Sequence, residues 1–366
     1  MSTSASIFQP QAMRILIASD AWHPQINGVV RVFETTAEIL RARGHVVEVI
    51  GPERFRTIPA PGYREVRLAL APGRALSRMI GDFAPDAIHV PVEGPIGLAA
   101  RRYCLKHAIP FTTSFHTRFG DYFEKRIGGG VDLAYAAQRW FHSAGAAIMV
   151  QTRTLEEGLS RRGFGPIRRW GRAVDTQSFR PMRDEPRFDA DFLGLPRPIF
   201  MYLGRVSSEK NLEAFLDLEL PGSKVVVGDG PAAAALKKSY PAAHFLGYRT
   251  GEDLPRHLSA ADVFVFPSRF ETFGLVVLEA LACGTPVAAF PVPGPLDILG
   301  DAPHAALGED LRQAALAALG IDRGGCRAFA QTFSWEECTR QFEANLERIP
   351  RAVWSLRAGG RDAEQA

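Results

Sequence analysis

Short apolar runs and amphipathic stretches alternate along almost the whole chain of 366 residues. The first apolar run, residues 14–18, is followed by a loop that contains Gly28 and then by an amphipathic stretch that predicts a helix over 32–43. Gly44 stands where a helix commonly ends. Further apolar runs predict strands at 46–50, 87–90, 111–114 and 147–150. Strands that alternate with helices in this way are typical of a parallel, doubly wound sheet.

The alternation starts again after residues 174–198, a segment rich in Pro, Asp and Arg that is typical of a linker. The second set of predicted strands covers 199–203, 224–227, 243–246, 263–266 and 286–290. Ser334 is the predicted N-cap of a closing helix over 335–346. We therefore expect an α/β fold of two doubly wound, Rossmann-like domains, with a cleft between the carboxyl ends of their strands, where open α/β sheets bind ligands.

The expected division of the chain has five parts. It consists of a disordered extension (1–12), an N-terminal acceptor-binding domain (13–178), a linker (179–197), a C-terminal donor-binding domain (198–333), and a closing helix with a tail (334–366).

Composition limits the class of protein. Hydrophobic residues make up 46% of the chain, which is enough for two cores, and no apolar stretch approaches the roughly 18–20 residues that span a bilayer. The extension 1–12 lacks the basic start and apolar run of a secretory signal. The four cysteines have no metal-ligand spacing, so reduced thiols in a cytoplasm are expected.

Charge is shared unevenly between the two halves. Residues 1–185 hold 25 Lys and Arg against 17 Asp and Glu, a balance of +8, whereas residues 186–366 hold 18 against 23, a balance of −5. A basic half indicates an anionic partner, which could be a nucleic acid, an anionic membrane or a phosphorylated substrate. An Arg-rich composition without any such partner is the alternative.

Two glutamates eight residues apart mark the most informative segment of the chain. Glu271 lies in a loop after a predicted strand, and Glu279 lies in the helix that the loop opens. Gly274 stands at the helix N-terminus, a place that favours a phosphate. Carboxylates on both sides of a phosphate would hold hydroxyls, which is the hydrogen-bonding pattern of a sugar nucleotide. An ordinary strand, loop and helix with solvated glutamates would have the same residues.

Other loops at strand ends carry residues suited to phosphates. Gly204 and Arg205 follow one predicted strand, and Lys210 is one loop away; two cations in a cleft suit a diphosphate. A solvated basic loop is equally compatible. Gly228 and Gly230 could admit a base or a ribose closely, or form a turn.

The N-terminal half contributes three candidates. Asn27 and Gly28 precede the first helix, where the backbone could approach a phosphate or make a tight turn. His116 follows a predicted strand and can reach the cleft, but a lone histidine is often structural.

Together these motifs resemble retaining glycosyltransferases of family 4. The resemblance rests on the order and spacing of segments over roughly residues 13–350, namely 24–29, 174–181, 204–210, 228–230, 271–287 and 333–335. It implies the GT-B fold, with the donor nucleotide bound mostly by the C-terminal domain and the acceptor mostly by the N-terminal one.

Carried over by position, the resemblance also implies roles for single residues. Arg205 and Lys210 would hold the diphosphate and stabilise the leaving group. Glu271 would bind sugar hydroxyls, Glu279 the ribose, and His116 would lie against the sugar. The expected catalytic residues are Arg205, Lys210, Glu271 and His116. The donor would further contact Asn27, Gly28, Gly204, Gly228 and Gly230, and the backbone amides of Phe273, Gly274, Leu275 and Val276.

The implied co-substrate is a nucleotide sugar, with neither a metal nor another cofactor, because basic side chains and a helix N-terminus replace a cation. A UDP-linked hexose or hexuronate is expected from family frequency. The chain departs from many relatives at residues 292–295, where two prolines would stiffen a loop and put its nucleotide contact in doubt.

The acceptor is predicted from a second pattern, in which basic residues and large aromatics are interleaved. The segments are 101–103, 118–126, 161–164 and 168–170. Such a surface can lie on an anionic bilayer with its rings at headgroup level. It could equally bind nucleic acid, but no nucleic-acid-binding fold signature accompanies it, so no nucleic-acid partner is expected.

Residues 115–123 also resemble members of the family that glycosylate diacylglycerol. We therefore expect a membrane-lipid acceptor and a cytoplasmic enzyme held peripherally at the inner face of the cytoplasmic membrane. The alternatives are an oligosaccharide or small soluble acceptor and, more distantly, a nucleotide-sugar epimerase of the same fold. A non-catalytic nucleotide-sugar sensor is not favoured, and neither is a dinucleotide dehydrogenase, since no Gly-x-Gly-x-x-Gly follows the first strand. The oligomeric state is not indicated.

Overall fold

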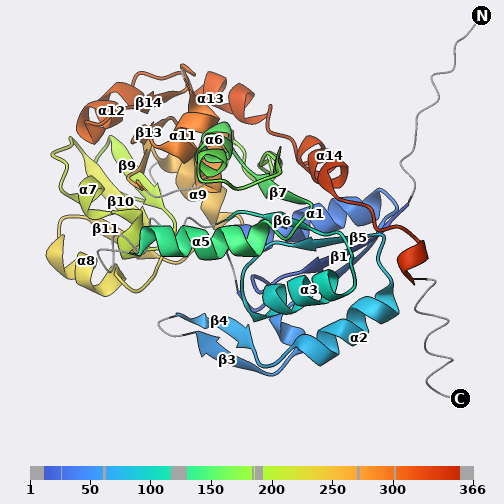
Figure 1. The fold of residues 1–366 in the computed structure, drawn as a ribbon. Coiled ribbons are helices and arrows are strands. Elements are labelled where there is room, and N and C mark those ends of the chain that lie inside the picture. The colour runs from blue at the N-terminus through green and yellow to red at the C-terminus, as the bar shows by residue number, and fades with distance from the viewer. Residues whose placement is uncertain are drawn as a thin grey trace, which may run out of the picture.

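The computed structural model describes residues 12–25, 27–60, 63–116, 130–183, 185, 193–269, 273–300 and 302–354. Two parallel sheets, each covered by helices, form two lobes that lie side by side (Figure 1). The expected α/β class with two doubly wound sheets is confirmed.

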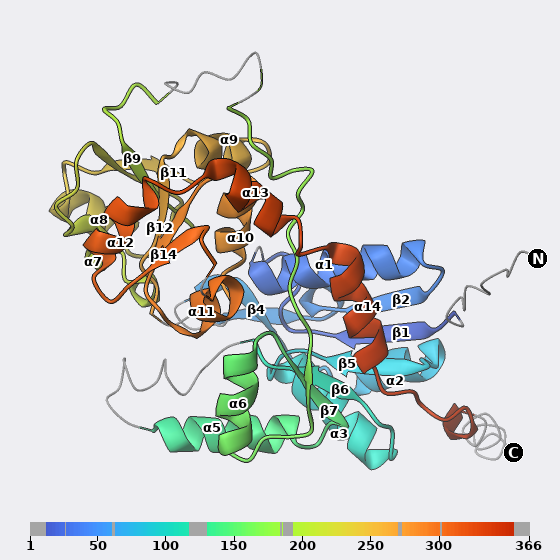
Figure 2. The same ribbon diagram turned by 90° about the horizontal axis from the view of Figure 1, so that it is seen from above.

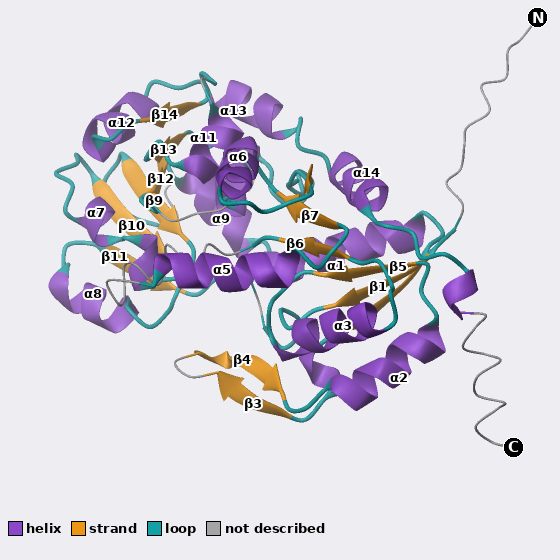
Figure 3. Ribbon diagram, viewed as in Figure 1, coloured by secondary structure: helices purple, strands orange, loops and turns teal. Residues whose placement is uncertain are grey.

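The first lobe is built on a six-stranded sheet of order β2-β1-β5-β6-β7-β8. Its strands are β1 (Arg14–Ala18), β2 (Val46–Ile50), β5 (Ala87–Val90), β6 (Thr112–Ser114), β7 (Ala147–Val150) and β8 (Ile167–Arg169). Its helices are α1 (Gly28–Ala42), α2 (Gly73–Phe83), α3 (Pro95–Lys106), α5 (Val131–His142) and α6 (Arg153–Arg161). After a short 3₁₀ turn, η1 (Pro52–Arg54), an antiparallel hairpin of β3 (Thr57–Ala60) and β4 (Tyr63–Ala69) projects from this lobe (Figure 3).

The second lobe has a six-stranded sheet of order β11-β10-β9-β12-β13-β14. Its strands are β9 (Ile199–Leu203), β10 (Ser223–Val227), β11 (His244–Gly247), β12 (Val263–Phe266), β13 (Val287–Ala289) and β14 (Ala305–Leu307). Its helices are α7 (Glu213–Leu216), α8 (Ala233–Ser239), α9 (Asp253–Ala260), α10 (Leu275–Ala282), α11 (Pro293–Leu299), α12 (Leu311–Ala318) and α13 (Arg323–Ala330), with a 3₁₀ turn η2 (Ser208–Lys210).

Continuous apolar strands explain both sheets. Every residue of β5, β9 and β12 is buried, because helices cover both faces of a parallel sheet and leave no face for polar side chains. The helices bury one stripe each, as α1 does with Val30, Phe33 and Leu40 among others.

The last helix, α14 (Trp335–Asn345), returns to the first lobe and lies beside α1 (Figure 2). Its Phe342 belongs to the same core as Phe33 and Trp170, and the Trp170 indole N–H donates to the Cys338 carbonyl oxygen over 3.1 Å. Ser334 caps this helix through the N–H of Glu337, as predicted.

The segment that joins the lobes packs on the second one. Val174 and Phe179 are buried in the core of that lobe, and Arg327 donates to the Phe179 carbonyl oxygen over 2.8 Å. The start of the predicted linker is therefore fixed in place.

Several local predictions need correction. The first helix begins at Gly28 and not at residue 32, because Asn27 caps it. Residues 292–295 do not form a loop stiffened by prolines: Val292 is the N-cap of α11, and Pro293 stands in the first turn, where its missing N–H costs nothing. The hairpin β3–β4 and the edge strands β8 and β14 were not predicted, since they are short or weakly apolar.

All four cysteines are free thiols in buried positions. Among the helices of the described residues, none is long and apolar enough to cross a bilayer.

Candidate functional site

Three loops of the second lobe meet at the carboxyl edge of its sheet. They follow β9, β10 and β12, and β9 lies between the other two strands. A Cβ atom on Gly228 would lie 1.9 Å from the Gly204 carbonyl oxygen, and one on Gly230 would lie 2.3 Å from the Val206 oxygen. The predicted glycines at 228 and 230 thus let the first two loops pack backbone against backbone. Gly204, with φ +150°, provides the other side of this contact.

The loop after β9 carries the two predicted cations. Arg205 is exposed and Lys210, in η2, is half-buried. The Tyr202 hydroxyl donates to the Arg205 carbonyl oxygen over 2.8 Å, and the Asn211 side-chain amide donates to the Pro267 oxygen over 3.1 Å. These bonds fix the loop and tie it to the loop after β12.

The N-terminus of α10 begins with a glycine. Its N-cap Gly274 has a left-handed φ of 88°, which favours glycine, and no side-chain cap bond is made to this helix by the described residues. Phe273 is buried before it, and Leu275 and Val276 form the first turn. The backbone N–H groups of such a turn and the helix dipole together attract an anion.

A second helix N-terminus faces this one from the other lobe. A Cβ on Gly28, the first residue of α1, would lie 3.6 Å from Leu275 Cδ1. Asn27 caps α1 by accepting from the N–H groups of Val29 and Val30 over 3.0 and 3.1 Å. The structure thus brings together the predicted Gly28 and the predicted first turn of α10, and the Asn27 side-chain oxygen Oδ1 caps α1.

Glu279 links the lobes. Its carboxylate is buried, and Arg31 of α1 donates to its Oε1 over 2.7 Å. Burial raises the pKa of Glu279, and the Arg31 guanidinium partly opposes that rise. Glu279 is therefore not a solvated helix residue.

Arg31 was not among the predicted residues. It lies three positions after Gly28, which places both on one face of α1, and this spacing is the signal that could have found it. Its guanidinium also lies 5.8 Å from the ring centre of Phe179.

His116 lies in a chain of buried polar groups in the first lobe. Arg172 Nη2 lies 3.3 Å from His116 Nδ1, and His116 Nε2 lies 2.7 Å from the Ser114 hydroxyl. The chain continues from Ser114 to His89 Nε2 at 3.0 Å and from His89 Nδ1 to Thr112 Oγ1 at 2.9 Å.

The direction of this chain follows from Arg172, which can only donate. His116 Nδ1 then accepts, its Nε2–H donates to Ser114, and the Ser114 hydroxyl donates to His89 Nε2. Burial and the Arg172 charge hold the pKa of His116 well below its usual value. His116 is a neutral imidazole whose ring nitrogens both bond to protein groups, and these bonds fix the orientation of its ring.

Part of the predicted site lies outside the described residues. Glu271 falls within 270–272, and the basic segment 118–126 falls within 117–129. The structure places neither.

The predicted membrane-facing aromatics are wrong at three positions. Tyr103 is 5% exposed, Phe164 5% and Trp170 0%. Each belongs to a core of the first lobe, because a ring beside arginines in sequence can point inward while the arginines point outward.

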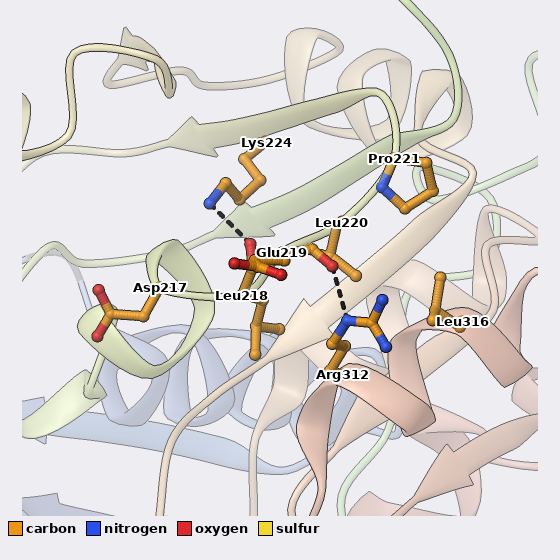
Figure 4. Close-up of a pocket in the computed structure, with 8 residues that line it drawn as sticks. All are labelled: Asp217, Leu218, Glu219, Leu220, Pro221, Lys224, Arg312 and Leu316. Carbon is orange, nitrogen blue, oxygen red and sulfur yellow. Dashed lines mark hydrogen bonds between the residues drawn. The ribbon is translucent and has the colours of Figure 1, made fainter.

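A pocket of about 770 Å³ lies elsewhere, at the amino end of β10 (Figure 4). Lys224 and Arg312 in this pocket donate to carbonyl oxygens of Leu218 and Glu219. Both cations thus bond to backbone oxygens. The pocket lies at the opposite edge of the sheet from the loops after β9 and β12.

No cluster of three or more His, Cys, Asp or Glu side chains suited to a metal ion occurs in the described part of the chain.

Two family models match the two lobes. Residues 26–178 match the model described as Glycosyltransferase Family 4, and residues 197–320 match the model described as Glycosyl transferases group 1.

Curated proteins match over most of the chain. The chain is 30% identical over 311 residues to a GDP-mannose-dependent alpha-mannosyltransferase of Mycolicibacterium smegmatis. This match covers 78% of this chain and 82% of that protein. It is 25% identical over 357 residues to an alpha-monoglucosyldiacylglycerol synthase of Streptococcus pneumoniae, covering 84% and 78%.

Solved structures share the fold. Sucrose-phosphate synthase from Thermosynechococcus elongatus has a TM-score of 0.69 at 21% identity, covering 90% of this chain and 97% of that one. Anabaena HepE in complex with UDP and glucose has a TM-score of 0.65 at 17% identity, covering 91% and 98%. The expected GT-B fold is confirmed.

Proposed function

The chain belongs to glycosyltransferase family 4 and is a glycosyltransferase, and we propose that it transfers a hexose or hexuronate from a nucleoside diphosphate sugar to a membrane lipid, diacylglycerol or a derivative of it. The observation that carries the donor part is the pair of helix N-termini that face each other across the lobes. Gly28 of α1 and the first turn of α10 meet there, so a diphosphate beside them would lie at the positive ends of two helix dipoles.

The remaining proposed donor contacts come from the loop after β9 and from α10. Arg205 and Lys210 lie at the end of β9, next to β12 and its loop, and their charges would stabilise the departing nucleoside diphosphate. Glu279, the fifth residue of α10, would accept hydrogen bonds from the ribose. For that, the ribose hydroxyls must share or replace the bond from Arg31.

The identity of the donor is best approached through the named relatives. The mycobacterial relative at 30% identity is GDP-mannose-dependent. We propose GDP-mannose as the first donor to test and a UDP-hexose or UDP-hexuronate, expected from family frequency, as the second.

In the proposed chemistry, the sugar is transferred with retention of configuration at its anomeric carbon. The bond from that carbon to the diphosphate oxygen breaks, and a bond to the acceptor hydroxyl oxygen forms on the same face. The leaving phosphate takes the hydroxyl proton. His116 does not act as the base in this scheme, because its Nδ1 lone pair accepts from Arg172 and its other nitrogen donates to Ser114.

The lipid part of the proposal is supported by an exposed apolar face on the first lobe. Leu133 is 76% and Trp140 58% exposed on α5, and Leu98 and Leu105 are 41% and 51% exposed on α3. Leu133 and Trp140 are seven positions apart, as are Leu98 and Leu105, so each pair lies on one face of its helix.

Cations accompany this apolar face. The Arg101 guanidinium stacks on the Trp140 ring at 3.8 Å and joins the two helices. Arg102 and Lys106 are exposed beside it. Apolar side chains flanked by arginine and lysine suit an anionic bilayer surface. We propose peripheral binding at the cytoplasmic membrane through α3 and α5.

The test is a transfer assay with the purified protein. GDP-mannose, UDP-glucose and UDP-glucuronate are each incubated with vesicles that contain diacylglycerol or monoglycosyl-diacylglycerol, with and without a chelator. A new glycolipid, formed equally with chelator present, is the expected result. Transfer only to soluble sugars would favour the oligosaccharide alternative, and interconversion of the nucleotide sugar without transfer would favour an epimerase.

A further inference from the structure

Arg172 is a buried arginine of the first lobe. It lies three residues after β8, and only 6% of its surface is exposed. Its guanidinium stacks on the Trp170 ring at 4.2 Å and donates to the Gly171 carbonyl oxygen over 3.1 Å and to His116 Nδ1 over 3.3 Å. All of these partners are neutral.

The charge of Arg172 is retained at neutral pH. Burial lowers the pKa of its guanidinium to about 10, which is still far above neutrality. The described titratable groups around it supply no compensating charge. Burial lowers the pKa of His89 to about 3 and that of His116 well below its usual value, and it raises the pKa of the Cys338 thiol.

No carboxylate pairs with Arg172 within the described residues. The carboxylates near this segment pair with other arginines: Glu347 pairs with Arg168 and Glu156 pairs with Arg169. A buried charge without a counter-ion costs several kcal/mol as a rule. A protein can bear that cost where a ligand supplies the opposite charge.

The position of Arg172 points to a ligand in the cleft. β6, β7 and β8 are neighbours in the sheet, and their carboxyl ends lead to His116, Gln151 and Arg172. Gln151 is also buried: its amide nitrogen donates to the Phe115 oxygen over 2.8 Å, and its Oε1 has no hydrogen-bond partner among the described residues. Within the described part of the chain, a cation without a counter-ion and an acceptor without a donor therefore follow neighbouring strands at one edge of the sheet.

We propose that Arg172 binds an anionic group of the acceptor, a carboxylate or a phosphate ester close to the hydroxyl that receives the sugar. The proposal rests on the proposed glycosyl transfer and narrows its acceptor to an acidic lipid or acidic glycolipid. The planar guanidinium suits both anions. The donor diphosphate is not the expected partner, because the cations proposed for it, Arg205 and Lys210, belong to the other lobe.

The first experiment compares acceptors that differ in charge alone. Glucuronosyl- and glucosyl-diacylglycerol form one pair, and phosphatidylglycerol and diacylglycerol form another, each presented in neutral detergent micelles. The wild-type enzyme should prefer the acidic member of at least one pair. Arg172→Gln should lower kcat/KM for that acceptor by about tenfold to a hundredfold, the size of a charge-assisted hydrogen bond, and change the neutral one by less than about threefold. Arg172→Lys should lie between.

The control is Arg340→Gln, which removes an exposed arginine of α14 that pairs with Glu337. It should leave both acceptors unaffected. Equal losses on acidic and neutral acceptors in Arg172→Gln would overturn the proposal, as would a wild-type preference for the neutral members. A weaker affinity of the variant for GDP and UDP without acceptor would assign the charge to the donor instead.

A second measurement keeps the subsite testable if no lipid is glycosylated or if Arg172→Gln does not fold. With the donor site saturated by nucleoside diphosphate, wild type and Arg172→Lys are titrated with methyl glucuronide against methyl glucoside, and with glycerol phosphate against glycerol. The acidic member should quench tryptophan fluorescence through Trp170 at a lower concentration. No difference within either pair would exclude the subsite, whereas failure of transfer with this difference intact would refute only the proposed lipid activity.

Discussion

At the scale of single residues, five charged residues distinguish the proposed donor and acceptor sites. Arg31 and Glu279 bridge the lobes at 2.7 Å, while Arg172 has no counter-ion among the described residues. The predicted cations Arg205 and Lys210 stand at the end of β9. The roles we propose for these groups differ, so single substitutions can separate them.

Arg205→Ala and Lys210→Ala should each lower kcat by about 100-fold or more, because a preorganised cation stabilises charge that develops only as the diphosphate leaves. The measurement is steady-state transfer with saturating donor. Lys238→Ala, a change in the last turn of α8, serves as the matched control and should retain the wild-type rate. Near wild-type rates in both site variants would remove the diphosphate site from this loop.

Glu279→Gln should raise the KM for the donor about tenfold and leave kcat within about threefold, since a ribose contact is the same in the ground state and the transition state. Glu337→Gln, which changes an exposed glutamate of α14, controls for the loss of one carboxylate. A fall in kcat at unchanged KM would mean that Glu279 acts on the reacting sugar.

The sequence predicted candidate residues for this site but not the partners that the structure gives them. The spacing of Gly274 and Glu279 on one short helix is local and visible in sequence. Arg31 and Glu279 are 248 positions apart, and Arg172 and His116 are 56 apart, so their pairing depends on how the lobes and strands are arranged. The need for glycine at 228 and 230 is also non-local, because a Cβ atom at either position would clash with a carbonyl oxygen of the neighbouring loop.

At the scale of elements, α3 combines an exposed apolar face with an N-terminus that is capped from another loop. Its outer face carries Leu98 and Leu105, and its N-terminus is capped by Asp20, which follows β1. The Asp20 carboxylate accepts from the N–H groups of Ile96 and Gly97, each over 2.9 Å. The sequence predicted neither, since an amphipathic pattern locates an apolar stripe but not whether a membrane or a core covers it.

Replacing Leu133 and Trp140 of α5 by Ser and Gln should reduce binding to anionic vesicles by about tenfold or more, because two large apolar side chains no longer enter the interface. Flotation at low salt measures this, and wild-type binding should fall as salt screens the basic residues. Leu319→Ser removes a leucine of the second lobe that is 40% exposed and should have no effect. Vesicle binding that survives the α5 changes would move the membrane face elsewhere.

Asp20 gives a pH-dependent stability with a defined sign. Burial is the main cause that raises its pKa to about 6, against 3.8 for an ordinary aspartate. Between about pH 4 and pH 6 the folded protein holds a proton that the unfolded chain has released, so this contribution to stability is present at low pH and is lost as pH rises through 6.

The difference of about 2 pH units corresponds to up to about 3 kcal/mol. The advantage of wild type over Asp20→Asn in urea unfolding should therefore be larger at pH 4 than at pH 7. Asp310→Asn, which removes the capping side chain of α12, controls for the loss of a cap bond. An advantage that grows toward pH 7 would show that the pKa of Asp20 is lowered.

At the scale of the whole molecule, the fold class and the two-lobe plan could be predicted because each lobe repeats strands and helices of ordinary length. The closing helix α14 was predicted with its cap, but its place against α1 and Trp170 was not, because that contact returns the end of the chain to the first lobe. The contacts between the two lobes were not predicted either. Besides Arg31 and Glu279, Asp297 of α11 accepts from the Thr154 N–H over 3.1 Å and from its hydroxyl over 2.9 Å, at the start of α6.

Asp297 thus places a negative charge at the positive end of a helix in the opposite lobe, and it acts only while the lobes are together. A donor that binds between α1 and α10 also needs them together, so its apparent affinity scales with the population of this state. Asp297→Ala removes two hydrogen bonds, each contributing about 1 kcal/mol, and should raise the donor KM about tenfold with little change in kcat. Its radius of gyration in solution without donor should increase, and donor should restore it. Arg153→Gln is the matched control, because Arg153 pairs with Glu157 on α6 itself and does not reach the other lobe. If the Asp297 variant bound donor like wild type, closure would depend on the bridge between Arg31 and Glu279, and α6 would have no part in it.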